Sequence, residues 1–112
     1  MNGTRIKPRE SSVSDVLVTE SSIVSVAKHV ASAAAPDGSE TVIVDPVSGT
    51  YFGVSDYGVR VWALIQQPRR VGDVRDMLLE EYEVAPEVLM ADMQSLISEL
   101  AQAGLVNVVQ EP

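Results

Sequence analysis

The chain has 112 residues and a mass of 12.0 kDa, which gives room for one domain that buries about two-thirds of its unfolded surface. Its formal net charge of -8 opposes binding to nucleic acid, because such binding depends on Lys and Arg side chains that neutralise phosphates. Cysteine is absent, which excludes disulfides and thiolate metal sites, and without a secretory signal or a span of ~20 apolar residues we expect a soluble cytoplasmic protein with no membrane partner.

Residues 1–21 mix charged residues, Ser and Pro with little periodicity, which predicts a flexible N-terminal tail. Its cations Arg5, Lys7 and Arg9 are interpreted as a solvated cluster. Within this tail, Val16 to Val18 are the residues expected to touch the domain. The folded domain is expected to cover residues 22–109.

Three consecutive strands are predicted after the tail. Ser22–Ala35 is rich in β-branched residues and reads as one strand, which should pair antiparallel with Thr41–Asp45 across a turn at residues 36–39. The third strand is Thr50–Val54. Pro and Gly between the last two strands supply turn chemistry, so these strands should form a β-hairpin.

Two helices should follow the hairpin. The first is predicted over Asp56–Gln67, with Ser55 as its N-cap, and it should end before the proline that follows. Gly58 marks a place where this helix approaches the sheet closely. The second helix is predicted over Val71–Val84, and its start is poorly capped because Arg70 occupies the capping position.

The third helix has the strongest periodicity in the chain. It should begin at Pro86, a favoured first-turn residue, and run to Ala103. Gly104 is then suited to the position after the helix, with Leu105 as a hydrophobic clamp over the last turn. For Val106–Val109, the pattern fits either a short edge strand or a segment that drapes over the core.

No catalytic or cofactor site is expected. His29 is the only histidine, and without Cys or a second His it lacks the partners for a zinc site or a nucleophilic triad. The seven glycines are scattered at turns and caps rather than grouped into a phosphate-binding loop. We therefore expect a protein that is not an enzyme and that uses neither a metal nor a cofactor.

The predicted fold class is α+β, a three-stranded antiparallel sheet followed by three helices. In this order, the segments DPVSGTYFGVSDYGVRVWALI, MLLEEYEV and ADMQSLISELAQAGLV resemble the PqqD-like family. This family comprises the recognition elements of ribosomally synthesised, modified peptides (RiPPs), including the leader-binding proteins of lasso-peptide clusters and the pyrroloquinoline quinone biosynthesis chaperone. The resemblance covers about residues 22–106 and implies a winged helix-turn-helix-like domain.

The resemblance further implies that the domain binds the leader segment of a precursor peptide. In such proteins the leader adds a strand beside the third strand, here Thr50–Val54, in a cleft walled by the third helix. The residues expected to contact it are Thr50, Tyr51, Phe52, Gly53, Val54, Val88, Leu89, Asp92, Met93 and Leu96.

Binding by strand addition is consistent with the residue types at these positions. Main-chain hydrogen bonds at a free edge carry little sequence information, so selectivity has to come from side-chain pockets. Leu89, Met93 and Leu96 offer an adaptable apolar wall, and Asp92 is placed to meet a Lys or Arg of the leader. We expect Met93→Glu to abolish binding while the fold survives. The alternative readings are core positions for Phe52, Leu89 and Met93, and a solvated carboxylate for Asp92.

The resemblance implies an adaptor that delivers the precursor to a modifying enzyme, such as the leader peptidase of a lasso-peptide pathway for antibiotic biosynthesis or a radical SAM enzyme. We expect a monomer or weak dimer. One alternative is a transcription-related, DNA-binding winged helix, but no Lys or Arg lies between Pro86 and Pro112 to enter a groove. The other is an acidic dimerisation or scaffold module whose free edge pairs with itself.

Overall fold

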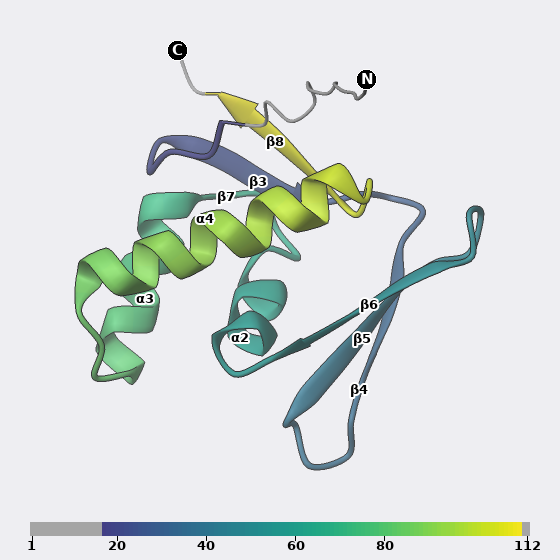
Figure 1. The fold of residues 1–112 in the computed structure, drawn as a ribbon, viewed down its shortest axis with the longest axis horizontal. Helices are drawn as coiled ribbons and strands as arrows, with labels where there is room; N and C mark the ends of the chain where they lie inside the picture. Colours follow the sequence, from purple (N-terminus) through teal and green to yellow (C-terminus); the bar gives the residue numbers. More distant parts are fainter. Residues whose placement is uncertain (1–16, 111–112) are drawn as a thin grey trace, which may run out of the picture.

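The computed structural model describes residues 17–110, which form three helices and two three-stranded antiparallel sheets (Figure 1). The α+β class is confirmed, although the strands form a second sheet that was not predicted. In chain order the elements are β3 (Ser22–Val26), β4 (Ala31–Ala34), β5 (Glu40–Asp45), β6 (Thr50–Ser55), α2 (Tyr57–Leu64), β7 (Arg69–Arg70), α3 (Val71–Glu81), α4 (Pro86–Gln102) and β8 (Val106–Gln110).

The predicted hairpin is confirmed as β5 and β6, the last two strands of the sheet β4-β5-β6. Its turn is closed by the Gly49 N–H, which donates to the Asp45 carbonyl at 2.8 Å, and Gly49 has a φ of +79° that residues with a Cβ resist. The Asp45 carboxylate accepts a further bond from the Val47 N–H at 2.9 Å. Residues local to the turn therefore set this register.

The predicted first strand, Ser22–Ala35, is wrong as a single element. The structure divides it into β3 and β4, and only β4 pairs with β5. β3 instead joins a second sheet in the order β7-β3-β8. The break follows from a tertiary contact, because the Ala27 N–H donates to the Leu105 carbonyl at 3.0 Å. The chain then turns locally, with the Val30 N–H donating to the Ala27 carbonyl at 3.3 Å.

The C-terminal segment is a strand rather than a draped coil. β8 pairs antiparallel with β3 over its whole length, with Val24 opposite Val108 and Val26 opposite Val106. This small sheet contacts α3 and α4, whereas the hairpin sheet contacts α2 (Figure 1). The helices are thus covered by two separate sheets.

α2 starts and ends differently from the prediction. Ser55 is the last residue of β6, and the N-cap is Asp56, whose φ of 54° and ψ of -128° turn the chain sharply and whose side chain makes no capping bond. The helix ends at Leu64, three residues before the predicted Gln67, because side chains donate hydrogen bonds to its last carbonyls. Gln66 donates to the Trp62 carbonyl at 2.8 Å, and Arg69 donates to the Leu64 carbonyl at 2.7 Å.

α3 begins at the predicted Val71 and ends three residues before the predicted Val84, and its N-cap Arg70 makes no capping bond, as expected. α4 begins at Pro86, as predicted, and ends one residue before Ala103.

The stop signal after α4 is confirmed in detail. Gly104 has a φ of +79°, and its N–H donates to the Ala101 carbonyl at 3.0 Å. The N–H of the buried Leu105 donates to the Leu100 carbonyl at 2.9 Å, which completes a Schellman motif.

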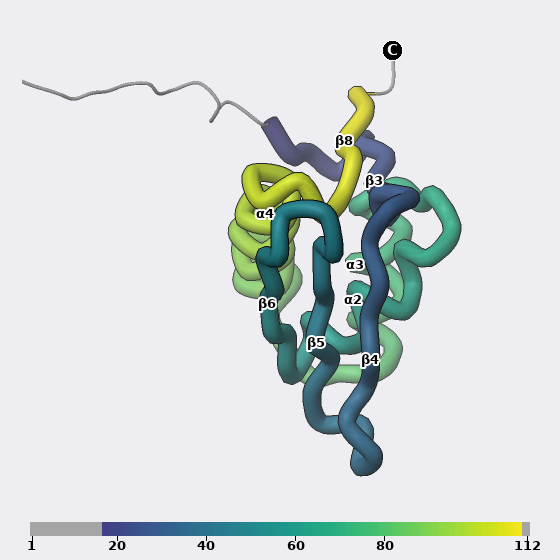
Figure 2. Tube along the Cα trace, turned by 90° about the vertical axis from the view of Figure 1, so that its right-hand side faces the viewer, coloured from purple at the N-terminus to yellow at the C-terminus, as the bar shows by residue number. Residues whose placement is uncertain are grey.

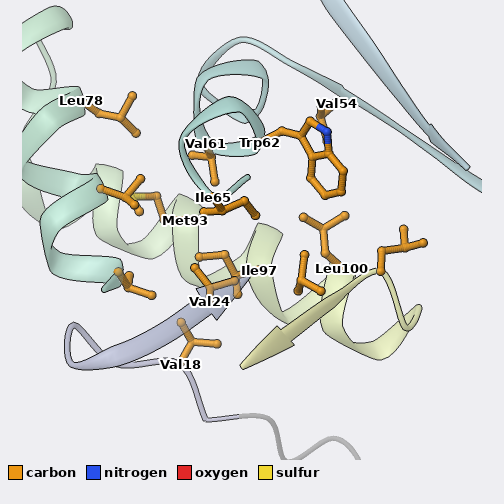
Figure 3. Close-up of a cluster of buried hydrophobic side chains, with 14 of the residues drawn as sticks. Val18, Val24, Val54, Val61, Trp62, Ile65, Leu78, Met93, Ile97 and Leu100 are labelled. Atoms are coloured by element: carbon orange, nitrogen blue, oxygen red, sulfur yellow. The ribbon is translucent and has the colours of Figure 1, made fainter. Parts of the chain in front are cut away.

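The hydrophobic core lies where the helices meet both sheets, and Figure 3 shows Val61, Trp62 and Ile65 facing Ile97, Leu100 and Val24. Trp62 and the α4 residues Ile97 and Leu100 are all buried in this core. Within residues 17–110, no helix combines the length and apolar character that crossing a bilayer requires.

The end of the predicted tail packs on the domain. Val18 is buried in the core, and its carbonyl accepts a bond from the Gln94 side chain at 2.7 Å. The Glu20 carbonyl accepts a bond from the Gly72 N–H at 2.9 Å. The rest of the predicted tail, residues 1–16 with the cations Arg5, Lys7 and Arg9, lies outside the described residues.

Candidate peptide-binding site

β6 forms one edge of the hairpin sheet. Among the described residues it pairs only with β5, so its second row of amides and carbonyls has no strand beside it. Figure 2 shows β6 on the side of the sheet nearest α4. Phe52 and Val54 point inward and lie opposite Ile43 and Thr41, whereas Tyr51 points outward and is 75% exposed.

A pocket of about 310 Å³ opens at the end of this edge. Three elements contribute its walls: the end of β6, the first turn of α2 and the middle of α4. The lining residues are Gly53, Val54, Ser55, Asp56, Tyr57, Gly58, Val61, Asp92, Met93 and Leu96. Because Val54, Val61 and Met93 are buried while Asp56 and Asp92 are exposed, the floor is apolar and carboxylates stand at the mouth.

The close approach that shapes the pocket depends on Gly58. A Cβ at this position would lie 3.0 Å from the Val54 Cβ and 3.5 Å from the Leu96 Cδ2. A contact of 3.0 Å forces the neighbouring atoms to move, so the missing side chain lets α2 sit directly against β6 and α4. The prediction of a close helix–sheet approach at Gly58 is confirmed.

The structure brings together half of the residues predicted as a site. Gly53, Val54, Asp92, Met93 and Leu96 line the pocket.

The other five lie outside the pocket. Thr50 and Tyr51 are exposed farther along the β6 edge, and the half-buried Phe52 packs against the core. Val88 is 52% exposed on α4, and Leu89 is fully buried in the core.

Sequence reasoning missed the pocket residues at the junction of strand and helix. Ser55, Asp56 and Tyr57 lie where β6 passes directly into α2, and Val61 faces the pocket one turn later. The signal was present, since a strand that continues into a helix places its junction beside the sheet edge. Ser55 was instead predicted as the N-cap of the helix and Asp56 as its first residue.

Met93 lines the pocket but is only 1% exposed. Its replacement by Glu would bury a charge in the core, which costs several kcal/mol unless the charge is paired. The burial of Met93 therefore argues against the expectation that Met93→Glu spares the fold, and we expect this variant to be destabilised. Leu96, half-buried on the same wall, is the better position for a charge that blocks the pocket.

The mouth of the pocket carries negative charge. Asp56 and Asp92 have no side-chain hydrogen bond and no ion pair within the described part of the chain, and neither Lys nor Arg lines the pocket. Nor do any three His, Cys, Asp or Glu side chains in residues 17–110 come together in a way that would hold a metal ion. The site is suited to a ligand that combines apolar and cationic groups.

Comparison with known proteins identifies similar folds. Two solved structures are similar: TbiB1 in complex with the TbiA(beta) leader peptide has 29% sequence identity and a TM-score of 0.67, covering 74% of this chain and 94% of that one. Lasso peptide synthetase B1 complexed with the leader peptide shares the fold, with 23% identity, a TM-score of 0.65 and coverage of 75% and 96%.

No match was found among proteins with curated functional descriptions. The family described as coenzyme PQQ synthesis protein D (PqqD) matches residues 40–106, which is more than half of the chain and includes β5, β6 and all three helices. The chain therefore belongs to the PqqD family.

Proposed function

We propose that this protein binds the leader segment of a ribosomally synthesised precursor peptide, of the lasso-peptide type, as an added strand on β6. The observation that carries the proposal is the β6 edge, which has no strand partner among residues 17–110 and ends in a pocket of about 310 Å³. The two similar structures support it, because both are complexes with a leader peptide.

The β6 edge would bind the backbone of the peptide, and the pocket would recognise one of its side chains. A guest strand satisfies the free backbone groups of β6 through hydrogen bonds that any sequence can make. The pocket reads a side chain, because its floor of Val54, Val61 and Met93 excludes water around one inserted group. Since a disordered peptide loses entropy on binding, we expect a dissociation constant from about micromolar to about tens of nanomolar.

The biological role that follows is that of an adaptor without chemistry of its own. Holding the leader raises the concentration of the precursor near a modifying enzyme, which accelerates the reaction without any catalytic group in the adaptor. In a lasso-peptide pathway this enzyme would be the leader peptidase.

The winged helix-turn-helix-like description of the domain stays a prediction.

The test is a fluorescence-anisotropy titration with a labelled synthetic leader. The probes are the leader of the precursor encoded beside this gene and the TbiA(beta) leader. Leu96→Lys places a long cationic side chain in the pocket wall and should weaken binding more than about tenfold, because it fills the pocket and repels a basic guest. Val109→Lys is the matched control, since Val109 is 59% exposed on β8, away from the pocket. Equal binding by Leu96→Lys and wild type would refute the proposed site.

Light scattering separates this function from self-association through the same edge. If β6 receives a peptide, the protein should be a monomer or weak dimer without the leader and form a complex of one chain with one peptide. A dimer that persists when the leader is saturating, and that Tyr51→Pro dissociates, would favour the scaffold alternative.

A further inference from the structure

The pocket beside β6 is amphipathic, and its two unpaired carboxylates come from different elements. Asp56 belongs to the β6–α2 junction and Asp92 to the middle of α4, yet both line the same cavity. We propose that Asp56 and Asp92 form an acidic clamp, which selects a Lys or Arg of the bound leader at the position opposite Val54. This inference rests on the proposed function and specifies what the pocket reads.

The first step of the argument is the register of the guest strand. Residues directly opposite one another on neighbouring strands point to the same face of a sheet. Val54 points inward and lines the pocket, whereas Tyr51 points to the outer face and is 75% exposed. A guest residue opposite Val54 therefore directs its side chain into the pocket, and its two neighbours in the guest strand point away.

The second step is the chemistry of the cavity from floor to mouth. Val54 and Val61, together with Met93, make an apolar floor, and the half-buried Leu96 extends it along α4. A purely aliphatic guest side chain would pack on this floor, but it would leave both carboxylates next to an apolar group without a partner. Lys and Arg carry a long apolar stem with a cation at its end, so they match both zones.

The third step is that no described cation already neutralises these carboxylates. Asp56 also borders a second pocket, which contains Arg60, but both oxygens of Glu81 hold the Arg60 guanidinium at 2.9 and 2.7 Å. The Asp92 side chain has no hydrogen bond or ion pair within residues 17–110. In a chain with a net charge of -8, two unpaired carboxylates at a binding pocket repel acidic guests and attract basic ones.

The test couples protein variants to leader variants in the same titration. Each Lys and Arg of the leader encoded beside this gene is replaced singly by Met, which keeps the apolar stem and removes the charge. One of these replacements should weaken leader binding to the wild-type protein by about fivefold. The same replacement should leave leader binding to the double variant Asp56→Asn with Asp92→Asn almost unchanged, because that protein no longer has the two partner charges. Raising the salt concentration should weaken wild-type binding more than binding by the double variant.

Glu99→Gln provides the matched control, because Glu99 is an exposed acidic residue of α4 outside the pocket. This variant should respond to every leader replacement as wild type does. Thermal unfolding of the Asn variants at the wild-type midpoint would show that the fold is kept.

The outcomes distinguish this inference from the function on which it rests. A leader that binds wild type and is rejected by Leu96→Lys, but contains no position coupled to the two aspartates, would overturn the acidic clamp and leave the proposed function standing. A leader that lacks Lys and Arg and still binds would do the same. Absence of any leader binding to wild type would overturn both.

Discussion

The indole N–H of Trp62 donates a hydrogen bond of 3.0 Å to the Ser32 hydroxyl oxygen. Trp62 is 4% exposed on α2, and Ser32 lies on β4, the outer strand of the hairpin sheet. A buried indole N–H needs a partner, so this bond fixes the sheet on the helix as well as satisfying the ring. It therefore contributes to the position of β6 on the opposite side of the same sheet.

Ser32→Ala should lower the free energy of unfolding by about 1 kcal/mol, because it leaves the Trp62 N–H without its acceptor. Urea unfolding followed by the fluorescence of the single tryptophan measures the change. Ser25→Ala in β3 is the control, since the Ser25 side chain makes no hydrogen bond within residues 17–110. Equal stability of the two variants would show that the indole bond contributes little.

Gly58→Ala should destabilise the protein by about 1–3 kcal/mol, because the new Cβ would lie 3.0 Å from the Val54 Cβ. Helix propensity alone predicts the opposite sign, a gain of about 1 kcal/mol. The same variant should weaken leader binding, since Gly58 lines the pocket. Ala63→Gly on the exposed side of α2 measures the propensity term by itself. A stabilised Gly58→Ala protein would mean that α2 relaxes away from β6 without cost.

Proline scanning tests which row of β6 backbone groups receives the guest. Successive residues of an antiparallel strand direct their amides alternately to one neighbour and the other. Thr50→Pro and Tyr51→Pro both replace exposed side chains, but Thr50→Pro also removes the bonds that the Thr50 N–H and hydroxyl make with the Ser48 hydroxyl, at 3.2 and 2.9 Å. Tyr51→Pro should lose leader binding with little change in thermal midpoint, whereas Thr50→Pro should lower the midpoint by weakening the β5–β6 turn. Leader affinity at the wild-type level in both variants would contradict strand addition at this edge.

The carboxyl of Asp45 should make the stability of the protein depend on pH in the acid range. Burial alone raises the pKa of its carboxyl, but the N–H groups of Val47 and Ser48 and the nearby His29 outweigh this effect and hold the pKa below its ordinary value of 3.8. The folded state therefore binds fewer protons than the unfolded state. The stabilisation is present above the ordinary pKa and is lost as pH falls through the folded-state pKa.

Asp45→Asn should accordingly cost most at neutral pH and least in acid, because the amide cannot ionise. Urea unfolding of both proteins at about pH 7 and about pH 3 measures the difference in the free energy of unfolding. A difference that stays constant between these pH values would show that the charge of Asp45 is unimportant. The side chain is 10% exposed, so the effect should survive moderate salt.

Features that depend on neighbouring residues were predictable. The β5–β6 turn follows from Pro46 and Gly49, and the start of α4 follows from Pro86. The Gly104–Leu105 stop signal after α4 was also correct. In each case the deciding interactions lie within about one turn of chain, so the local sequence contains the whole cause.

Features that depend on distant partners were not predictable. Ser22–Ala35 has the composition of one long strand, but Ala27 bonds to Leu105 and β3 pairs with β8, whose residues lie at the other end of the chain. Likewise, the local sequence suggests that Asp56 belongs to the first turn of the helix, where a carboxylate interacts favourably with the helix dipole. In the structure Asp56 is the residue between β6 and α2, its side chain makes no capping bond, and it lines the pocket.

By itself, the amino-acid sequence determined the α+β class, the hairpin, three helices with nearly correct starts, and the acidic character that disfavours nucleic acid. Only the tertiary structure decided that the first strand divides between two sheets, that β6 has no second strand beside it within residues 17–110, and that Asp56 and Asp92 line the same pocket. Local propensity acts over a few residues, whereas strand partners and pocket walls are chosen by packing between segments far apart in the chain.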